Sequence, residues 1–187
     1  MSAVLEVFSA FGLSASTGLN AYIPLLVTAL LAKFTNLIHL EEPWNALTSW
    51  WIIGLLIVLV LVETVLDKIP VVNHFNDGVQ SFIRPTAGAI LFAASANIIT
   101  DVHPVLSLAL GLLISGSVNL VKTVAVRPAV AAGTAGVGNI PVSIMEDATS
   151  TGVSVLAIAA PITVLVIFVT FIGWILWRFV IRPLTKD

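Results

Sequence analysis

Long apolar runs separated by short polar stretches constrain this chain more than any other feature of its sequence. The longest runs cover Leu5–Ile38, Thr48–Leu66, Val105–Val124 and Val153–Trp177. About twenty apolar residues are enough for one helix to cross the hydrocarbon core of a bilayer. The mean hydropathy is +1.09 and only 10% of the residues are charged, whereas about a quarter are charged in a soluble domain. The sequence therefore predicts an integral membrane protein.

The predicted fold is all-α, because polar and apolar residues do not alternate as they do in the strands of a membrane barrel. We expect a polytopic membrane protein of about six transmembrane helices, some of them interrupted or re-entrant, in a single integral membrane domain over residues 1–187. After the second crossing, Pro70–Ile83 is predicted to be a loop with a short interfacial helix, in which Asp77 caps a turn. Arg84 and Pro85 are predicted to open the third helix, with proline in its favoured first turn.

The first apolar run is too long for one perpendicular crossing. As a continuous helix its roughly 34 residues would extend about 50 Å, against a hydrocarbon core of about 30 Å. Strong tilt, a break or a helical hairpin would each resolve this mismatch. Gly18 and Pro24 weaken the helix, and the hydroxyl of Thr17 and the amide of Asn20 can bond backbone groups that a break exposes. We therefore predict a break near Thr17–Pro24.

The segment Pro128–Met145 is rich in glycine and poor in bulky side chains. Its glycines and Pro141 weaken a regular helix, so it is predicted to be either a thin crossing helix or a re-entrant one. A full crossing is preferred because it keeps the basic residues before and after it on one side of the membrane. Glu146 and Asp147 are predicted to follow in a polar turn, before a sixth, long helix.

Two short stretches in the chain resemble one another. Ser16–Pro24 reads STGLNAYIP and Thr134–Pro141 reads TAGVGNIP. The likeness suggests two polar, interrupted helices that meet near the middle of the bilayer, as the discontinuous helices of several transporters do.

The distribution of charge predicts the orientation of the chain in the membrane. Six crossings with both termini in the cytoplasm place most basic residues inside, namely Lys68, Arg84, Lys122, Arg127, Arg178, Arg182 and Lys186. The same topology leaves the acidic residues Glu41, Glu42, Asp101, Glu146 and Asp147 outside. This is the pattern of the positive-inside rule, with Lys33 as the exception.

Ionisable side chains gather at the end of the second apolar run. Glu63 and Asp67 are four residues apart and share one face of a helix, while Asp77 and Arg84 follow Pro70. Ionisable groups at membrane depth are costly and usually mark a functional site. The alternative is that Glu63 and Asp67 lie at the cytoplasmic interface and only pair with Arg84.

The sequence thus suggests a set of candidate residues for binding a substrate or an ion. They are Thr17, Asn20, Glu63, Asp67, Asp77, Arg84, Asn139, Glu146 and Asp147. No catalytic residue, metal site or cofactor is expected, since the chain has no cysteine and no G-x-S-x-G, HExxH or P-loop motif. The formal charge of −2 and the thin spread of basic residues argue against nucleic acid as a partner.

Four motifs taken in order resemble a known family. They are GLNAYIPLL, ETVLDKIP, DGVQSFIRPTAGA and GNIPVSIMEDATS, and together they extend over nearly the whole chain. The chain resembles the bacterial membrane-protein family known as domain of unknown function 4126. The resemblance implies a polytopic protein of the bacterial cytoplasmic membrane and supports the choice of residues, but it implies no activity.

A transporter of a small solute or a lipid-linked anion is the function that these features favour. Broken helices would expose backbone groups to a substrate, the carboxylates would exchange protons, and Arg84 would hold an anionic group. The main alternative is an oligomeric ion channel lined by Thr17–Asn20 and Gly133–Asn139. An intramembrane enzyme or a structural subunit is a weaker alternative. The expected partners are membrane lipid, a small molecule or ion, and a second copy of the chain in a homodimer.

Overall fold

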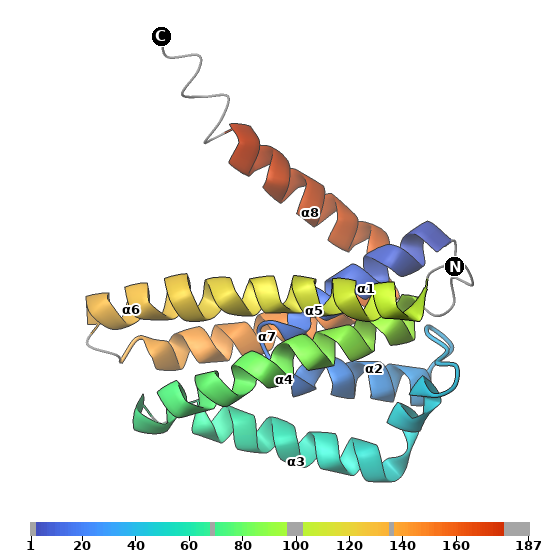
Figure 1. Ribbon diagram of the computed structural model, residues 1–187, viewed down its shortest axis with the longest axis horizontal. Helices are drawn as coiled ribbons and strands as arrows, with labels where there is room; N and C mark the ends of the chain where they lie inside the picture. Colours follow the sequence, from blue (N-terminus) through green and yellow to red (C-terminus); the bar gives the residue numbers. More distant parts are fainter. Residues whose placement is uncertain (1–2, 68–69, 97–102, 135–136, 178–187) are drawn as a thin grey trace.

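A computed structural model describes residues 3–67, 70–96, 103–134 and 137–177 (Figure 1). Within these ranges every regular element is a helix, so the predicted all-α class is confirmed. The helices are α1 (Ala3–Thr17), α2 (Tyr22–Phe34), the short 3-10 helix η1 (Trp44–Thr48), α3 (Trp50–Leu66), α4 (Pro70–Ala96), α5 (Pro104–Val121), the π-helical turn η2 (Lys122–Val126), α6 (Arg127–Thr134), α7 (Asn139–Ala159) and α8 (Pro161–Leu176).

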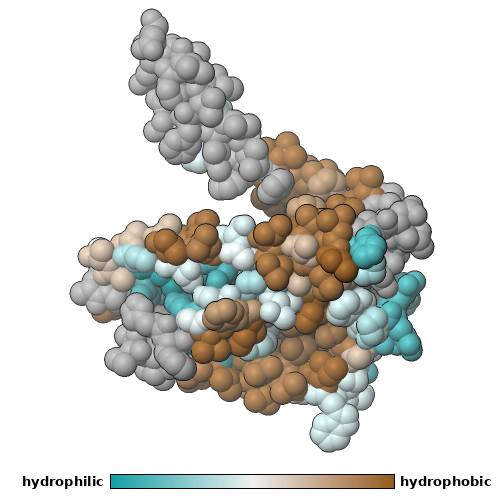
Figure 2. Space-filling model, viewed as in Figure 1, coloured by the Kyte–Doolittle hydropathy of each residue, from teal (hydrophilic) through white to brown (hydrophobic). Residues whose placement is uncertain are grey.

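The bundle is apolar outside and polar inside. More polar than apolar side chains are buried, while many large apolar residues are exposed, among them Trp51, Leu61 and Val124. Figure 2 shows apolar side chains over most of one face, with a band of polar side chains beside α6. This distribution suits a lipid environment, where apolar surface is not penalised and polar groups must find partners within the protein.

One helix within the described ranges is long and apolar enough to cross a membrane. It extends over Pro104–Thr134, and shorter apolar helices extend over Val4–Thr17, Tyr22–Phe34 and Trp50–Leu66. The helical, apolar-surfaced chain is therefore one that can associate with a membrane. The count of six crossings stays a prediction.

The first apolar run is a helical hairpin whose tip lies part-way along the bundle (Figure 1). The predicted break is confirmed, because α1 ends at Thr17 and α2 begins at Tyr22. The two arms run in opposite directions, since Glu6 and Ser9 near the start of α1 line the same cavity as His39, which follows α2. The run therefore enters the bundle and returns to the same end, as a hairpin and not as one broken helix.

Helix α4 corrects the predicted loop over Pro70–Ile83. The chain is helical from Pro70 to Ala96, so Asp77 caps no turn and Pro85 lies inside the helix instead of opening it. Asn76, Gln80 and Arg84 are four residues apart on one face, and all three side chains are buried against other helices. These polar residues are therefore the inner face of a long helix and not a loop in water.

The polar segments nearer the C-terminus are also helical. Arg127 and Pro128 continue the helix that began at Pro104, so the described residues of Pro128–Met145 belong to two helices, α6 up to Thr134 and α7 from Asn139. Glu146 and Asp147, predicted in a polar turn, lie within α7, where Ser143, Glu146, Ser150 and Ser154 form one buried face. The predicted sixth helix over Val153–Trp177 is divided at Ala160, after which Pro161 begins α8.

Small residues allow α4 to lie directly against α5. A Cβ atom added to Gly88 would clash with Ser115 and would lie 2.8 Å from Thr17 Oγ1 and 2.9 Å from the carbonyl oxygen of Gly111. Hydroxyl groups join the same surfaces, because Ser115 donates to the carbonyl of Arg84 at 2.8 Å. This close packing holds the polar face of α4 at a fixed position.

We predict that Gly88→Leu destabilises the protein by about 2 kcal/mol or more, because the added atoms overpack a backbone contact. The matched control is Gly78→Ala in the same helix, where an added Cβ meets no atom within 4 Å. That substitution should stabilise α4 by about 0.5–1 kcal/mol through the higher helix propensity of alanine. Unfolding by SDS in mixed micelles measures both free energies. Equal effects at the two positions would contradict the packing.

Candidate functional site

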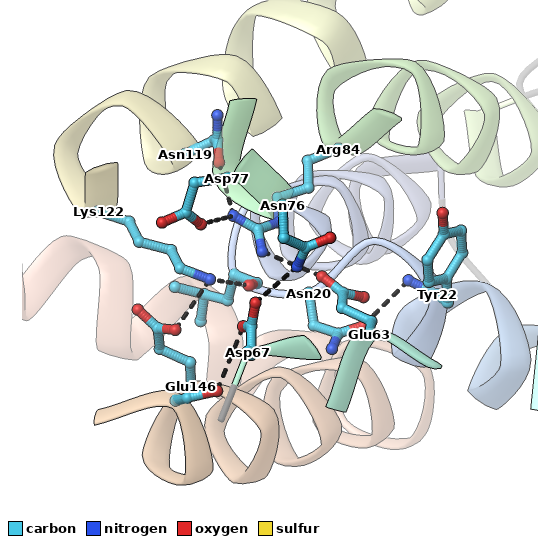
Figure 3. A network of polar contacts seen from close by, with 12 residues as sticks. Asn20, Tyr22, Glu63, Asp67, Asn76, Asp77, Arg84, Asn119, Lys122 and Glu146 are labelled. Carbon is cyan, nitrogen blue, oxygen red and sulfur yellow. Dashed lines mark hydrogen bonds and ion pairs between the residues drawn. The ribbon is translucent and has the colours of Figure 1, made fainter. Parts of the chain in front are cut away.

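Charged side chains from four helical segments meet inside the bundle, beside the tip of the hairpin (Figure 3). Glu63 comes from the last turn of α3 and Asp67 follows it, while Asp77 and Arg84 come from α4. The continuous helix Pro104–Thr134, which is made of α5, η2 and α6 and is called the long helix below, supplies Lys122 and Arg127. Helix α7 supplies Glu146. We call these seven residues the ion network.

Arg84 is the innermost member, with none of its side chain exposed. Its Nη2 atom donates to Glu63 Oε1 at 3.0 Å, and its Nη1 atom donates to Asn119 Oδ1 at 2.9 Å. The same Nη1 atom lies 3.6 Å from Asp77 Oδ1. The guanidinium therefore joins α3, α4 and α5, and its charge is balanced by two carboxylates.

Arg127 contacts three carboxylates at once. Its Nη1 atom lies 2.6 Å from Asp77 Oδ2, and its Nη2 atom lies 2.9 Å from both Asp67 Oδ2 and Glu146 Oε2. Asp67 also accepts hydrogen bonds from Asn76 at 2.7 Å and Ser143 at 3.2 Å. Five donors in a rigid fork allow arginine to bridge several carboxylates, which a lysine cannot do in the same way.

The π-helical turn explains how Lys122 and Arg127 reach the same partner. The backbone N–H of Arg127 donates to the carbonyl of Lys122, a spacing of five residues. In an α-helix residues three or four apart share a face, whereas residues five apart diverge. The wider π-helical turn directs both cations towards the inside of the bundle. Lys122 Nζ lies 2.8 Å from Glu146 Oε2, the oxygen that Arg127 also contacts. Such π-bulges frequently occur at functional sites.

The hairpin tip is attached to the network through both side chain and backbone. Lys122 Nζ donates to the carbonyl of Leu19 at 2.6 Å. Asn20 donates through Nδ2 to Asp147 Oδ1 at 2.9 Å, and its Oδ1 accepts from the backbone N–H groups of Tyr22 and Ile23 at 3.0 Å. Asn20 therefore caps α2 and links it to α7. Any change in the pairing of Lys122 or Asp147 acts directly on the tip.

The structure brings together most of the candidate residues. Glu63, Asp67, Asp77, Arg84 and Glu146 form the ion network, and Asn20 joins Asp147 beside it. Glu146 and Asp147 were predicted on the opposite side of the membrane, and this is wrong, because Glu146 pairs with Lys122 and Arg127.

Two candidates lie outside the network. Thr17 is buried where α1 meets α5 and donates to Ser115 Oγ at 2.8 Å. Asn139 begins α7, and its Oδ1 atom is buried without a hydrogen bond. The first of the two similar stretches meets α7, the helix that begins in the second, but it does so at Asp147, which the amide of Asn20 contacts, while residues 135–136 of the second stretch lie outside the described residues.

Sequence reasoning missed several members of the site. Lys122 and Arg127 were predicted only as basic residues on the cytoplasmic side, and Asn76, Gln80 and Asn119 were not selected as site residues. Arg84 and Asn119 come from helices distant in sequence, and their contact depends on packing. The four-residue spacing of Asn76, Gln80 and Arg84 was a usable signal, because it marks one helical face.

The site holds more acid than base. Five carboxylates (Glu63, Asp67, Asp77, Glu146 and Asp147) face three cations (Arg84, Lys122 and Arg127), which leaves two negative charges if all are ionised. Along the network the signs alternate, from Glu63 through Arg84, Asp77, Arg127 and Glu146 to Lys122. Two carboxylates, Asp77 and Glu146, each touch two cations, so a cation can change its partner with only small movements. Such an arrangement is suited to taking up a proton or another cation.

A comparison with known protein families identifies the family of this chain. The family model described as a domain of unknown function, DUF4126, matches residues 7–180. The chain belongs to this family. No curated protein and no solved structure matches it. The match confirms the resemblance drawn from the four motifs, and the matched DUF4126 region contains every member of the ion network.

We predict that Arg127→Gln destabilises the protein by about 3 kcal/mol, because it leaves Asp67 and Glu146 buried with less compensating charge. Adding Asp67→Asn should recover part of this loss, since the second change removes one of the uncompensated carboxylates. The control is Lys33→Gln, at a half-buried lysine that donates to the carbonyl of Thr48, where the cost should stay below about 1 kcal/mol. SDS unfolding measures all three variants. Additive losses in the double variant would contradict the network.

Proposed function

We propose that this protein is a membrane transporter for a small solute or a lipid-linked anion. The observation that carries the proposal is the seating of a helical hairpin tip on a buried network of alternating charges, through Leu19 to Lys122 and Asn20 to Asp147. Several transporter folds build their sites from interrupted helices, whose ends offer partial charges and free backbone groups at membrane depth.

The proposal explains the internal polarity of the bundle. A protein that only filled space in a membrane would gain nothing from burying Arg84, Lys122 and Arg127, because each buried charge carries a large desolvation cost. An ion network with shared partners can instead exist in more than one pairing. Switching between pairings would move the hairpin tip relative to α5 and α7. Such a movement favours an alternating-access transporter rather than a channel with a fixed pore.

For the topology, we propose five crossings with a re-entrant hairpin, in place of six full crossings. Helices α3, α4, α5–η2–α6, α7 and α8 would cross, and α1 and α2 would enter and leave on one side. The basic sequence after α8 favours a cytoplasmic end for that helix. The N-terminus then lies on the opposite side, contrary to the expectation of two cytoplasmic termini. A bacterial cytoplasmic membrane and a homodimer remain part of the proposal, the latter because small-residue faces suit helix packing.

Single cysteines test this topology, because the natural chain has none. With a re-entrant hairpin, Val4→Cys and Glu42→Cys should react with a membrane-impermeant maleimide from the same side of the membrane. Gly133→Cys, near the far end of α6, should react only from the other side. Labelling of Val4→Cys and Glu42→Cys from opposite sides would show that residues 5–38 cross the membrane and would overturn the hairpin topology.

Transport is tested in proteoliposomes with entrapped pH and potential dyes and a panel of small anions and cations. The wild type should give saturable flux, and Asn20→Ala should reduce it at least tenfold, because the variant loses both the cap of α2 and the bond to Asp147. Asn45→Ala, an exposed residue of η1, is the matched control and should leave the flux unchanged. Non-saturating, potential-driven current would favour an oligomeric channel, and flux equal in Asn20→Ala and wild type would refute the role of the tip.

A further inference from the structure

We propose that Glu63 is the site where this protein binds its coupling proton, with Gln80 and Tyr22 beside it. This inference rests on the proposed transport function and names the ion that drives it. The starting observation is that Glu63 is 1% exposed and that only one of its carboxylate oxygens has a hydrogen-bond partner. Oε1 accepts from Arg84, whereas Oε2 is buried without a donor.

A second unpartnered acceptor lies in the same part of the bundle. Gln80 is 3% exposed and its Oε1 atom is buried without a hydrogen bond. Tyr22, in the first turn of α2, lies within interaction range of both Glu63 and Gln80. A buried acceptor without a donor is destabilising, because it has lost its hydrogen bonds to water without replacement. A proton on Glu63 Oε2 turns this acceptor into a hydrogen-bond donor. The site, where Glu63 Oε2 and Gln80 Oε1 both lack a donor, then gains one.

The other carboxylates are better provided for. Asp67 and Glu146 contact Arg127, and Glu146 also contacts Lys122. Asp77 lies between Arg84 and Arg127, and although its Oδ1 atom also lacks a hydrogen bond, that atom lies 3.6 Å from Arg84 Nη1 and the side chain is 16% exposed. Asp147 accepts from the amide of Asn20 and is only half-buried. Glu63 alone among them combines nearly complete burial with an unpartnered oxygen.

The surroundings of Glu63 favour a proton over a metal cation. The charged and titratable groups around it are Tyr22 from α2, Asp67 after α3, Asp77 and Arg84 from α4, Lys122 and Arg127 from the long helix, and Glu146 and Asp147 from α7. A metal cation needs several oxygen ligands, and Arg84, 3.0 Å from Oε1, already occupies one of the two carboxylate oxygens. A proton enters without needing several oxygen ligands and reduces the excess negative charge of the site by one.

Proton binding at Glu63 would break the ion pair at one end of the ion network, along which negative and positive charges alternate. Once Glu63 is neutral, Arg84 loses its ionic partner on α3 and is held on the acidic side by Asp77 alone. Asp77 is shared with Arg127, which also holds Glu146, and Glu146 holds Lys122 at the hairpin tip. A proton on Glu63 thus changes which ion pairs are favoured along the network, as far as Lys122 and its hydrogen bond to the carbonyl of Leu19.

The chain contains its own reporter for this event, because Tyr22 is its single tyrosine. Protein labelled with 13C at tyrosine Cζ and placed in lipid nanodiscs should show one resonance, whose shift changes in a single step during a pH titration as Glu63 gains or loses its proton. Glu63→Gln should abolish the step, since glutamine imitates the protonated acid. Glu63→Asp should retain a step, and Glu42→Gln, at an exposed glutamate outside the site, is the control and should leave the wild-type step in place.

Each alternative outcome decides against the inference. A resonance that does not change with pH in folded wild-type protein, or a step that survives Glu63→Gln, would overturn it, and a step lost only in Asp147→Asn would move the proton to Asp147. A shift caused by NaCl at constant pH, absent with choline chloride, would identify an alkali cation instead. If Glu63→Gln does not fold, infrared difference spectra give the second test, because 13C-glutamate labelling must shift the C=O band of the protonated acid in wild-type protein and must no longer shift it in Glu63→Asp.

The measurement is independent of the transport assay. A titration step assigned to Glu63 without any flux would retain the proton site and refute the transporter. Saturable flux without such a step would retain the transporter and refute the proton site.

Discussion

The contact of Arg127 with three carboxylates is the interaction on which the rest of the structure depends. Asp67, Asp77 and Glu146 come from three parts of the chain, and each would lose a cationic partner without it. A charge inside a protein is costly without such a partner, so the helices that carry these carboxylates are held where the guanidinium can reach all of them. The position of α7 relative to α4 follows from this one side chain, together with Arg84 and Lys122 beside it.

The π-helical turn is the local device that makes this contact possible. Without the wider turn at Lys122–Val126, Lys122 and Arg127 would point to different sides of the helix. The same turn brings Lys122 to the carbonyl of Leu19, and so the hairpin tip and the ion network become one structure. Close contacts between small residues, such as Gly88 on α4 and Gly111 on α5, let these helices approach closely enough for the polar faces to meet.

The errors of the sequence prediction share a physical cause. Asn76, Asp77, Gln80, Glu146 and Asp147 were assigned to loops or turns because polar residues between apolar runs usually face water. In this bundle apolar side chains cover the surface, and polar residues turn inward while remaining helical. The helical spacing of the polar residues was present in the sequence, but it marks the buried face of the helix and not a face exposed to water. The break at Thr17–Tyr22 was predictable because it depends on local chemistry, on glycine, proline and a capping asparagine.

By itself, the sequence determined the helical class, the apolar surface, the interruption of the first run and the choice of Glu63, Asp67 and Arg84 as a polar centre. These features follow from composition, from the lengths of runs and from spacing within single helices. Only the tertiary structure decided that Glu146 joins this centre, that Lys122 and Arg127 complete it, and that the first run returns to the end at which it entered. Partners of opposite charge 19 to 60 residues apart are chosen by packing and by the need to compensate every buried charge, and neither is visible in a local stretch of residues.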